Sequence, residues 1–401
     1  MNARDTFHAT KNCRPAGRLP SSSMNMLLAL ALGLGSALAA ADAAQPVAKP
    51  SPPNDPAAST VYMDNVHLVK SPSNWHMTGT AGSMAMEAVF VGSYFRVKFH
   101  GTGVDIHVDT AGLSEYPWVG YRIDDGEDSV NLLTADQKVI RISRLPVGEH
   151  SLFVFYHARN NFNQRNTWAD AQKLRILSLA FFGGRGILPS TARPLKGILY
   201  GDSITAGLAC GAAPGVRCSD KYVNGATASY AYFLGNGLNA EYDQAGCGGD
   251  GWTKGGVGGF PGFQNGWNYK KAGVARDLSQ HDFVTIYHGY NDGKVPDSVV
   301  GSMMEKLRSA NSNMWIFVMV PFSGRNKAAI VNGVADHLSK HPAETRIKVI
   351  DTSGVRIKTA DGIHPTPAGA EVLAKFMTSS IKEYLAGESK TAPAAASFGK
   401  P

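Results

Sequence analysis

The chain has 401 residues, of which 43% are hydrophobic and 18% are charged, and its formal net charge is +7. The apolar fraction is too high for a disordered chain, and four cysteines are too few for a disulfide-stabilised scaffold. The length suggests two domains of roughly 100–200 residues each. A nucleic-acid partner would require the basic excess to be clustered, so its position along the chain matters.

The amino-terminal segment has the pattern of a secretory signal peptide. Basic residues precede the apolar run MNMLLALALGLGSALAA, and small residues follow it as A-x-A-like cleavage sites. A membrane anchor is the alternative, but the run is shorter than the ~20 residues of a spanning helix. We therefore predict a signal peptide over residues 1–44 and a periplasmic or secreted protein that is free of the membrane after cleavage. The start codon (Met1, Met24 or Met26) and the cleavage site stay open.

Removal of this segment changes the charge and the cysteine content. Residues 1–44 hold four basic and two acidic residues, which leaves +5 on the rest of the chain, without a Lys/Arg run, so we expect no nucleic-acid partner. In an oxidising compartment, Cys210 and Cys218 bracket a short loop and are expected to pair. Cys247 would then be a free thiol; a catalytic role for it lacks a neighbouring Cys-His motif.

In the first half of the exported chain, the sequence pattern predicts β structure. Residues 45–59 are rich in Pro, Ala and Ser, which is typical of a linker. From residue 60 to 185, short β-branched and aromatic runs recur with turn signals between them, and this pattern predicts a β-sandwich or jelly roll. The predicted strands are 94–99, 104–108, 118–123, 139–142, 151–156 and 174–180.

The second half alternates strands with helices. The predicted strands are 195–200, 283–287, 315–320 and 347–350, and the predicted helices are 226–238, 298–310, 327–338 and 367–385, the last capped by Thr366. This alternation predicts an α/β domain over residues 190–386, with a parallel sheet covered by helices on both faces. Residues 387–401 are expected to form a flexible tail.

Polar residues with catalytic potential follow three of these strands, and the carboxyl ends of parallel strands meet at one edge of a sheet. Ser203 follows the first strand where a helix begins, so it is placed as an exposed nucleophile. Asn291 can direct an amide N–H at a developing oxyanion. Asp361 and His364 can share one turn, with the imidazole reaching the serine. Each motif alone is common in turns, but their combination in this order is specific.

These motifs resemble the sequence blocks of the SGNH (GDSL-type) hydrolases over about residues 195–385. GDSIT at 201–205 resembles the first block, GYND at 289–292 the third, and DGIHP at 361–365 the last. The resemblance implies a three-layer SGNH fold with Ser203 as nucleophile, His364 as base, Asp361 as its orienting partner and Asn291 as an oxyanion donor. The serine context departs from the Gly-x-Ser-x-Gly turn of α/β-hydrolases.

The family's second block supplies a glycine N–H to the oxyanion hole. In GCGGDG at 246–251 the Gly-Asp pair favours Gly249, with Gly248 as the alternative, so the implied oxyanion hole consists of Ser203, Gly249 and Asn291. A β-sandwich directly before GDSIT also resembles carbohydrate esterase family 2, whose members remove acetyl groups from polysaccharides such as xylan and glucomannan. The segments FHGTGV, IDDG and LPVGEHSL of the sandwich carry this second resemblance.

The resemblance implies an exported serine esterase that removes O-acetyl groups from acetylxylan or a glucomannan-type polysaccharide. It implies no metal or organic cofactor, and we expect a monomer. A lipase, arylesterase or thioesterase of the same fold and an O-acetylesterase acting on a bacterial glycan are the alternatives. A non-enzymatic carbohydrate-binding protein is disfavoured because all four catalytic motif residues are present.

Several further residues with a possible binding role allow more than one interpretation. Trp252, Trp267 and Tyr290 are candidate substrate-binding residues that could stack on sugar rings, but aromatic residues after the second block could instead anchor a loop to the core. The polar segment 160–168 could reach over the active site. His337 and His341 have a metal-ligand spacing, yet HLSKH lacks the Glu of His-Glu-x-x-His. For these two we expect solvated groups near a helix C-terminus, and we predict no metal site.

Overall fold

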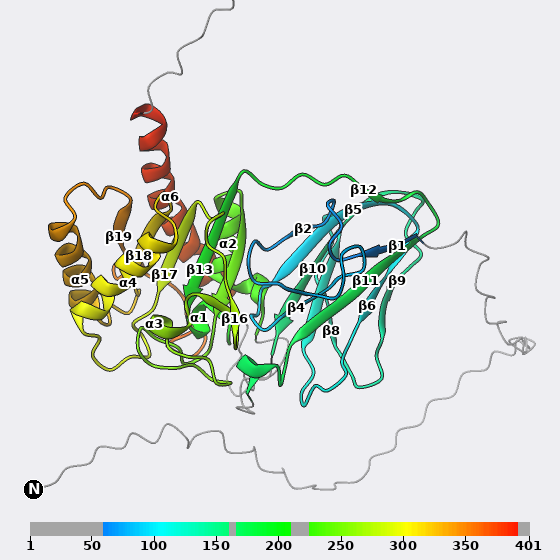
Figure 1. The fold of residues 1–401 in the computed structure, drawn as a ribbon, viewed down its shortest axis with the longest axis horizontal. Helices are drawn as coiled ribbons and strands as arrows, with labels where there is room; N and C mark the ends of the chain where they lie inside the picture. The colour runs from blue at the N-terminus through cyan, green and yellow to red at the C-terminus, as the bar shows by residue number, and fades with distance from the viewer. Residues whose placement is uncertain (1–58, 160–165, 210–223, 392–401) are drawn as a thin grey trace, which may run out of the picture. The chain divides into compact units, whose positions relative to one another are not determined.

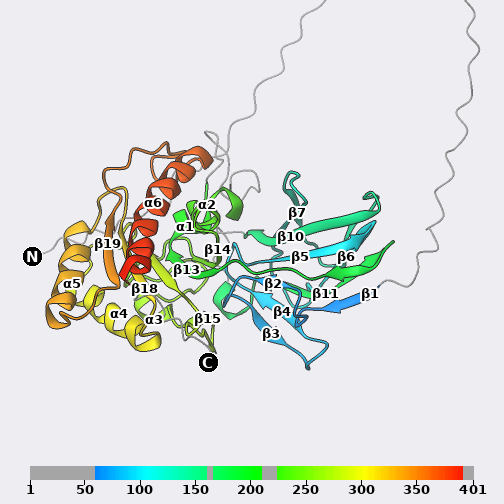
Figure 2. The same cartoon turned by 90° about the horizontal axis from the view of Figure 1, so that it is seen from above.

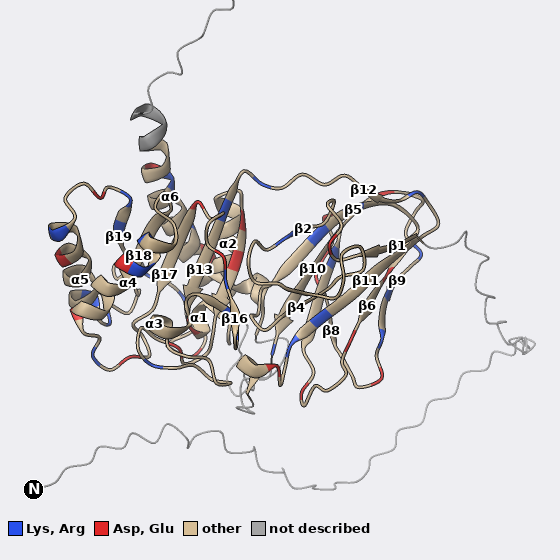
Figure 3. Cartoon of the chain, viewed as in Figure 1, with Lys and Arg blue, Asp and Glu red and all other residues tan. Residues whose placement is uncertain are grey.

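A computed structural model describes residues 59–159, 166–209 and 224–391, all of which belong to one compact unit, Asp55–Pro401. The predicted signal peptide, the linker up to residue 58 and the Cys210–Cys218 pair lie outside the described residues. Within these ranges, no helix is both long and apolar enough to cross a membrane. Figure 3 shows Lys and Arg interspersed with Asp and Glu over the described elements.

The first part of the described chain consists of two antiparallel six-stranded sheets, which confirms the predicted β-sandwich (Figure 1). One sheet has the order β3-β4-β11-β6-β9, with β1 paired to β11, and the other has the order β12-β5-β10-β7-β8, with β2 paired to β5. The strands are β1 (Ser59–Tyr62), β2 (Val69–Lys70), β3 (His76–Thr78), β4 (Ala85–Ala88), β5 (Tyr94–Gly101), β6 (Gly103–Val108), β7 (Trp118–Ile123), β8 (Ser129–Leu132), β9 (Val139–Ile142), β10 (Gly148–Ala158), β11 (Leu174–Phe182) and β12 (Gly186–Leu188). The described helical structure here is limited to the 3₁₀ turn η1 (Thr167–Ala169).

The sandwich core forms because side chains alternate between the two faces of each strand. In β5, Phe95, Val97 and Phe99 are buried while Lys98 between them is exposed. Strand β12 pairs with β5, so the sandwich continues to Leu188 and not only to the predicted boundary at 185. Three residues, Gly-Ile-Leu, are too few to show a strand pattern in the sequence.

The second part contains a five-stranded parallel sheet with the order β14-β13-β17-β18-β19, which confirms the predicted α/β fold. Its strands are β13 (Leu195–Gly201), β14 (Ala240–Gly246), β17 (Phe283–Tyr287), β18 (Trp315–Val320) and β19 (Ile347–Asp351). The chain enters at β13, adds β14 on one side and then crosses to β17 on the other side. Such a change of direction opens a crevice at the carboxyl ends of the strands.

Helices pack on both faces of this sheet. Helices α2 (Tyr230–Gly237) and α6 (Pro367–Thr391) cover one face, and α4 (Asp297–Ala310) and α5 (Lys327–Lys340) cover the other (Figure 2). The shorter elements are α1 (Ser203–Ala206), η2 (Ala226–Ala228), α3 (Phe263–Gly266), β15 (Tyr269–Lys271) and β16 (Val274–Ala275).

Two helices differ from their predicted bounds. The segment predicted as one helix over 226–238 is interrupted at Ser229, whose hydroxyl accepts a hydrogen bond from the Ala231 N–H (3.1 Å) and caps α2. Helix α6 begins after Thr366, as predicted, with the Gly369 N–H donating to the threonine hydroxyl (3.2 Å). It continues to Thr391, past the predicted end at 385, because no proline occurs before residue 393.

Strand β14 was not predicted, since its sequence AEYDQAG has neither a β-branched residue nor an apolar run. All seven residues are nevertheless buried, because β14 lies at the edge of the sheet where the sandwich packs. Its Asp243 carboxylate accepts hydrogen bonds from the backbone N–H groups of Ser73 (2.9 Å) and Asn74 (2.8 Å) and from the Ser73 hydroxyl (2.5 Å). His281 reaches the same carboxylate at 2.9 Å.

The other polar residues of β14 are bound in the same way. Glu241 accepts a hydrogen bond from the Tyr94 hydroxyl (2.6 Å) and forms an ion pair with Arg96, both residues of the sandwich strand β5. The backbone carbonyl of Gln244 accepts from the Asn74 amide at 3.1 Å. The sandwich therefore supplies the polar partners that allow a charged strand to be buried at the edge of the sheet.

The contacts of Asp243 also fix its ionisation. Burial alone would raise the pKa of this carboxyl group, but the hydrogen bonds from His281 and Ser73 and the nearby positive charges of His281 and Arg276 lower it below its ordinary value. Because the folded-state pKa is depressed, the resulting stabilisation is present above the unfolded-state value of about 3.9 and is lost as the pH falls through the folded-state value.

We predict that Asp243→Ala lowers the free energy of unfolding by about 3–5 kcal/mol, since it leaves the donors of Ser73, Asn74 and His281 without their acceptor. Urea denaturation at neutral pH measures this change. Asp336→Ala, which removes an exposed carboxylate on α5, should change the free energy of unfolding by less than about 1 kcal/mol. Equal effects of the two substitutions would contradict the role assigned to Asp243.

Candidate active site

The structure brings together the three residues that the sequence predicts as a catalytic triad. The His364 Nε2 atom lies 2.9 Å from Ser203 Oγ, and its Nδ1 atom lies 2.7 Å from Asp361 Oδ2. Ser203 is 161 positions from His364 in the chain, so only the fold joins them. A serine, an imidazole and a carboxylate linked in this order form the arrangement that activates a hydroxyl nucleophile.

Ser203 is positioned by the turn that follows β13. It is the first residue of α1, and the Asp202 carboxylate before it caps this helix by accepting from the Ile204 N–H at 2.9 Å. The Gln244 amide of β14 donates to the Thr205 carbonyl at 2.6 Å. Gly246 lies so close to this turn that a Cβ atom there would come within 2.5 Å of the Ala206 nitrogen. The edge strand therefore holds the nucleophile's turn directly.

His364 and Asp361 belong to a single tight turn before α6. One oxygen of the Asp361 carboxylate accepts the backbone N–H groups of Ile363 (3.0 Å) and His364 (2.8 Å), and the other oxygen accepts from the imidazole. Burial would raise the pKa of Asp361, but the hydrogen bonds and charge of His364 outweigh it and lower the pKa. An ionised Asp361 fixes the orientation of the ring.

The three predicted oxyanion donors differ in their present contacts. Neither the Ser203 N–H nor the Gly249 N–H donates to another described residue. Gly249 has a φ of +76°, a conformation that glycine adopts without strain. The Asn291 amide nitrogen donates to the Asp202 carboxylate (3.0 Å) and to the Asp250 carbonyl (2.9 Å). Both of its hydrogens are thus used, and an oxyanion would have to share one of them.

Buried carboxyl groups beside this site were not singled out from the sequence. Asp202 and Asp250 are 1% and 8% exposed. Burial raises the pKa of Asp202 to about 7 and that of Asp250 well above its ordinary value, and the charge of Asp292 adds to both shifts. The aspartates stand next to the motif residues Ser203, Gly249 and Asn291, so a strand-end position is the signal that could have identified them.

Asp292 holds the loop that follows the second block. Its carboxylate accepts the backbone N–H groups of Trp252 (2.9 Å) and Thr253 (3.0 Å), and the Thr253 hydroxyl at 3.0 Å. The neighbouring His288 is buried, which lowers its pKa to about 4. The third block therefore contributes a loop anchor as well as Asn291, and the residue directly before it, His288, is a neutral imidazole at neutral pH.

Cys247 is a free and fully buried thiol, as predicted. Burial raises its pKa to about 12, so it carries no thiolate at neutral pH and is not a nucleophile. Its sulfur accepts a hydrogen bond from the Arg159 guanidinium at 2.8 Å. Arg159 follows β10, so a buried side chain of the sandwich contacts the segment that carries Gly249.

The predicted sugar-stacking role of Trp252 is wrong. Its side chain is fully buried and packs against Phe263 and His288, because the glycine-rich segment folds its aromatic rings into the core. Trp267 is partly buried against the same core. Tyr290 is partly exposed and lies under the Arg325 guanidinium, 4.8 Å from its centre. Tyr290 and Trp267 therefore remain candidates for substrate contact.

The segment predicted to cover the active site is described only from residue 166. The Trp168 N–H donates to the Gly258 carbonyl at 2.9 Å, and its ring packs on Phe260 at 5.0 Å. The described end of this insertion thus supports the glycine-rich loop.

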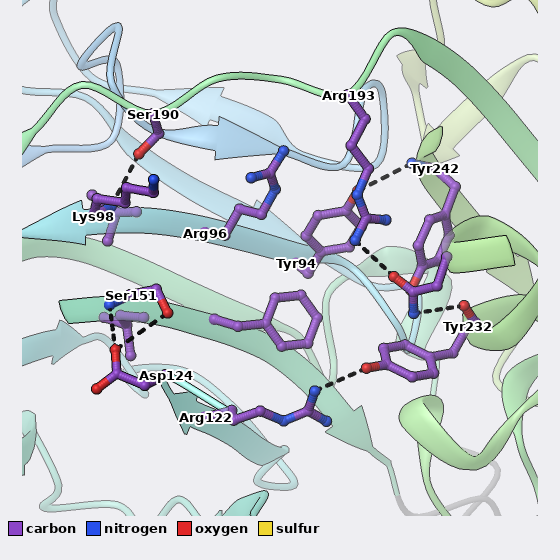
Figure 4. A pocket seen from close by; sticks show the side chains of 14 residues that line it. Tyr94, Arg96, Lys98, Arg122, Asp124, Ser151, Ser190, Arg193, Tyr232 and Tyr242 are labelled. Atoms are coloured by element: carbon purple, nitrogen blue, oxygen red, sulfur yellow. Dashed lines mark hydrogen bonds between the residues drawn. The ribbon is translucent and has the colours of Figure 1, made fainter. Parts of the chain in front are cut away.

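A cavity of about 240 Å³ lies between the sandwich strands β5, β7 and β10 and the helix α2 (Figure 4). Arg193, which precedes β13, donates to the Asn236 side chain at 2.7 Å, and Arg122 donates to the Tyr232 hydroxyl at 2.9 Å. These two hydrogen bonds connect the sandwich strand β7 and the segment before β13 to side chains of α2. Ser203, Asp361 and His364 are not among the residues that line this cavity, so it is not the active site.

Comparison with known proteins agrees with the predicted fold. Residues 199–372 match the GDSL-like Lipase/Acylhydrolase family, a span that includes Ser203, Asn291 and His364. The chain therefore carries a GDSL-like, SGNH-type hydrolase domain, as the sequence motifs indicated. Comparison with curated protein sequences finds no match.

Solved structures of similar fold match the β-sandwich as well as the α/β domain. A family two carbohydrate esterase from Cellvibrio japonicus matches with a TM-score of 0.69 at 17% identity, over 82% of this chain and 98% of that one. A family two carbohydrate esterase from Clostridium thermocellum in complex with cellohexaose matches with a TM-score of 0.65 at 16% identity, over 80% and 99%. An acetyl xylan esterase from Butyrivibrio proteoclasticus matches with a TM-score of 0.63 at 16% identity, over 82% and 99%. At these identities the likeness is one of fold.

We predict a specific pH dependence from Asp202. Its pKa is about 7 in the folded protein and about 3.9 in the unfolded chain, so between these values the folded state holds a proton that the unfolded state has lost. Its contribution to the free energy of unfolding therefore falls as the pH rises from about 4 to about 7, by roughly 4 kcal/mol in total.

Asp202→Asn removes this titration, so its free energy of unfolding should fall less steeply over that interval than that of the wild type. Urea denaturation at a series of pH values measures both curves, with Asp336→Asn as a surface control that follows the wild type. Parallel curves for Asp202→Asn and the wild type would show that Asp202 is ionised normally.

Proposed function

We propose that this protein is an exported serine esterase that removes O-acetyl groups from a carbohydrate. The observation that carries the proposal is the hydrogen-bonded series Ser203–His364–Asp361 at the carboxyl edge of the sheet. It is supported by the fold of carbohydrate esterases of family two, which this chain shares over both its sandwich and its α/β domain.

The reaction proceeds in two steps. His364 Nε2 accepts the Ser203 proton while the hydroxyl oxygen attacks the ester carbonyl carbon, and Asp361 stabilises the imidazolium through Nδ1–H. The N–H groups of Ser203 and Gly249 donate to the oxyanion, and Asn291 shares an amide hydrogen with it. As the intermediate collapses and the carbon–oxygen bond to the sugar breaks, the His364 imidazolium protonates the leaving sugar oxygen, which departs as a hydroxyl. Water, activated by the same imidazole, releases acetate from Ser203.

The structures of similar fold support an acetylated glycan, and not a lipid ester, as the substrate of this protein. One structure of similar fold is an acetyl xylan esterase, and another holds cellohexaose. Tyr290, which precedes Asn291 in the chain, and Trp267, which follows α3, are the partly exposed aromatic candidates for contact with a sugar ring. Export is proposed from the signal-peptide pattern over residues 1–44. Plant polysaccharide and bacterial glycan are both acetylated carbohydrates, and a substrate panel separates them.

We predict that the wild type releases acetate from acetylated xylan, glucomannan or a bacterial glycan faster than it cleaves a long-chain lipid ester. Ser203→Ala should lower this rate by about 10⁴–10⁶-fold, since the nucleophile is gone. The measurement is enzymatic quantification of acetate, with far-UV circular dichroism to verify folding of each variant.

Ser302→Ala, an exposed serine on α4, is the matched control and should retain full activity. Undiminished acetate release by Ser203→Ala would overturn the assignment of the active site. A clear preference for the lipid ester would instead retain the active site and replace the substrate.

A further inference from the structure

A second cluster of polar side chains lies between α4 and α5. Glu305 of α4 and His337 and His341 of α5 place one ligand atom each within 4.8 Å of one another. His337 Nδ1 is 3.2 Å and His341 Nε2 is 2.5 Å from the same carboxylate oxygen of Glu305. The two imidazole rings are stacked with centroids 4.5 Å apart.

The environment of this cluster differs from the solvated groups that the sequence suggested. His337 is only 4% exposed, because it faces α4. Glu305 and His341 are about half exposed, so the cluster is anchored on one side and open to solvent on the other. The nearest charged neighbours, Arg308 and Glu344, are bound to each other at 2.6 Å.

Two imidazoles and a carboxylate form a donor set for a first-row transition ion. Zn²⁺ binds histidine nitrogen at about 2.0–2.1 Å and carboxylate oxygen at about 2.0–2.2 Å, so its ligand atoms stand about 3.3–3.5 Å apart in a tetrahedron. The His337 Nδ1–Glu305 oxygen distance of 3.2 Å is close to this spacing. The His341 Nε2–Glu305 oxygen distance of 2.5 Å is about 1 Å shorter, so a rotamer change of the half-exposed Glu305 or His341 side chain would have to open it. Imidazole ligands favour Zn²⁺, Ni²⁺ or Cu²⁺ over Mg²⁺ and Ca²⁺.

We propose that Glu305, His337 and His341 form a binding site for Zn²⁺ or a similar transition ion, with water completing its coordination. The HLSKH motif does not reveal this site because the third ligand lies outside the motif. Glu305 precedes His337 by 32 positions, and the packing of α4 against α5 brings the two side chains together.

The site serves stability and not the ester reaction. Helix α5 connects β18 to β19, so it runs opposite to the strands, and its carboxyl end with His341 lies toward the amino ends of the strands. Ser203 and His364 follow the carboxyl ends. An ion held by both helices would link α4 to α5 across the sheet face that they cover, and would stabilise the folded state by mass action.

The test is isothermal titration calorimetry of the chelator-treated full chain with Zn²⁺, and separately with Mg²⁺. We expect one Zn²⁺ per chain, a raised melting temperature with Zn²⁺ and no effect of Mg²⁺. Glu305→Gln, His337→Gln and His341→Ala should each weaken Zn²⁺ binding by about tenfold or more, without lowering esterase activity.

His67→Ala, a histidine outside the cluster, is the control and should bind Zn²⁺ as the wild type does. His341→Ala and Glu305→Gln change half-exposed side chains, so they keep the test valid where the buried His337→Gln fails to fold. Absence of Zn²⁺ binding by the wild type would overturn the proposal. Binding that is equally strong in Glu305→Gln and His341→Ala would overturn it as well.

Discussion

Burial of the polar strand β14 at the edge of the catalytic sheet is the constraint on which the rest of this structure depends. A buried carboxylate without partners would cost several kcal/mol, and β14 contains two, Glu241 and Asp243. The sandwich provides their partners through Ser73, Asn74 and Tyr94. The sandwich is therefore part of the same compact unit as the sheet and not an independent attachment.

This edge also shapes the active site. Gln244 binds the turn of Ser203, and the chain leaves β14 at Gly246 to form the segment that carries Gly249. Arg159 of the sandwich contacts that segment through Cys247. Asp202 and Asp250, two buried carboxyl groups with raised pKa values, lie beside the oxyanion donors. Donors that are already in position stabilise the charge that develops on the ester oxygen in the transition state. The proposed zinc site lies toward the other end of the strands, which separates stabilisation from catalysis.

Much of this could be predicted from the sequence, for physical reasons that also explain the failures. Strands such as Trp315–Val320 are continuous apolar runs. The motif residues Ser203, Asn291 and His364 follow strand ends, so their position along the chain indicates the site. Strand β14 could not be predicted because the hydrogen-bond partners that allow its burial lie about 150–170 positions away in the chain. Trp252 was misjudged, since a glycine-rich context suggests a surface loop while Asp292 in fact folds that loop inward. The burial of His337 likewise depends on packing between two helices.

Ser203 is the group on which these elements converge, and its nucleophilicity can be measured directly. The measurement is covalent labelling by a fluorophosphonate, followed by intact-mass and peptide-mass spectrometry of the full chain. The arrangement described here predicts one label per chain, located on Ser203, and labelling slowed by orders of magnitude in His364→Ala. Labelling at another residue, or equally fast labelling of Ser203 in His364→Ala, would contradict it.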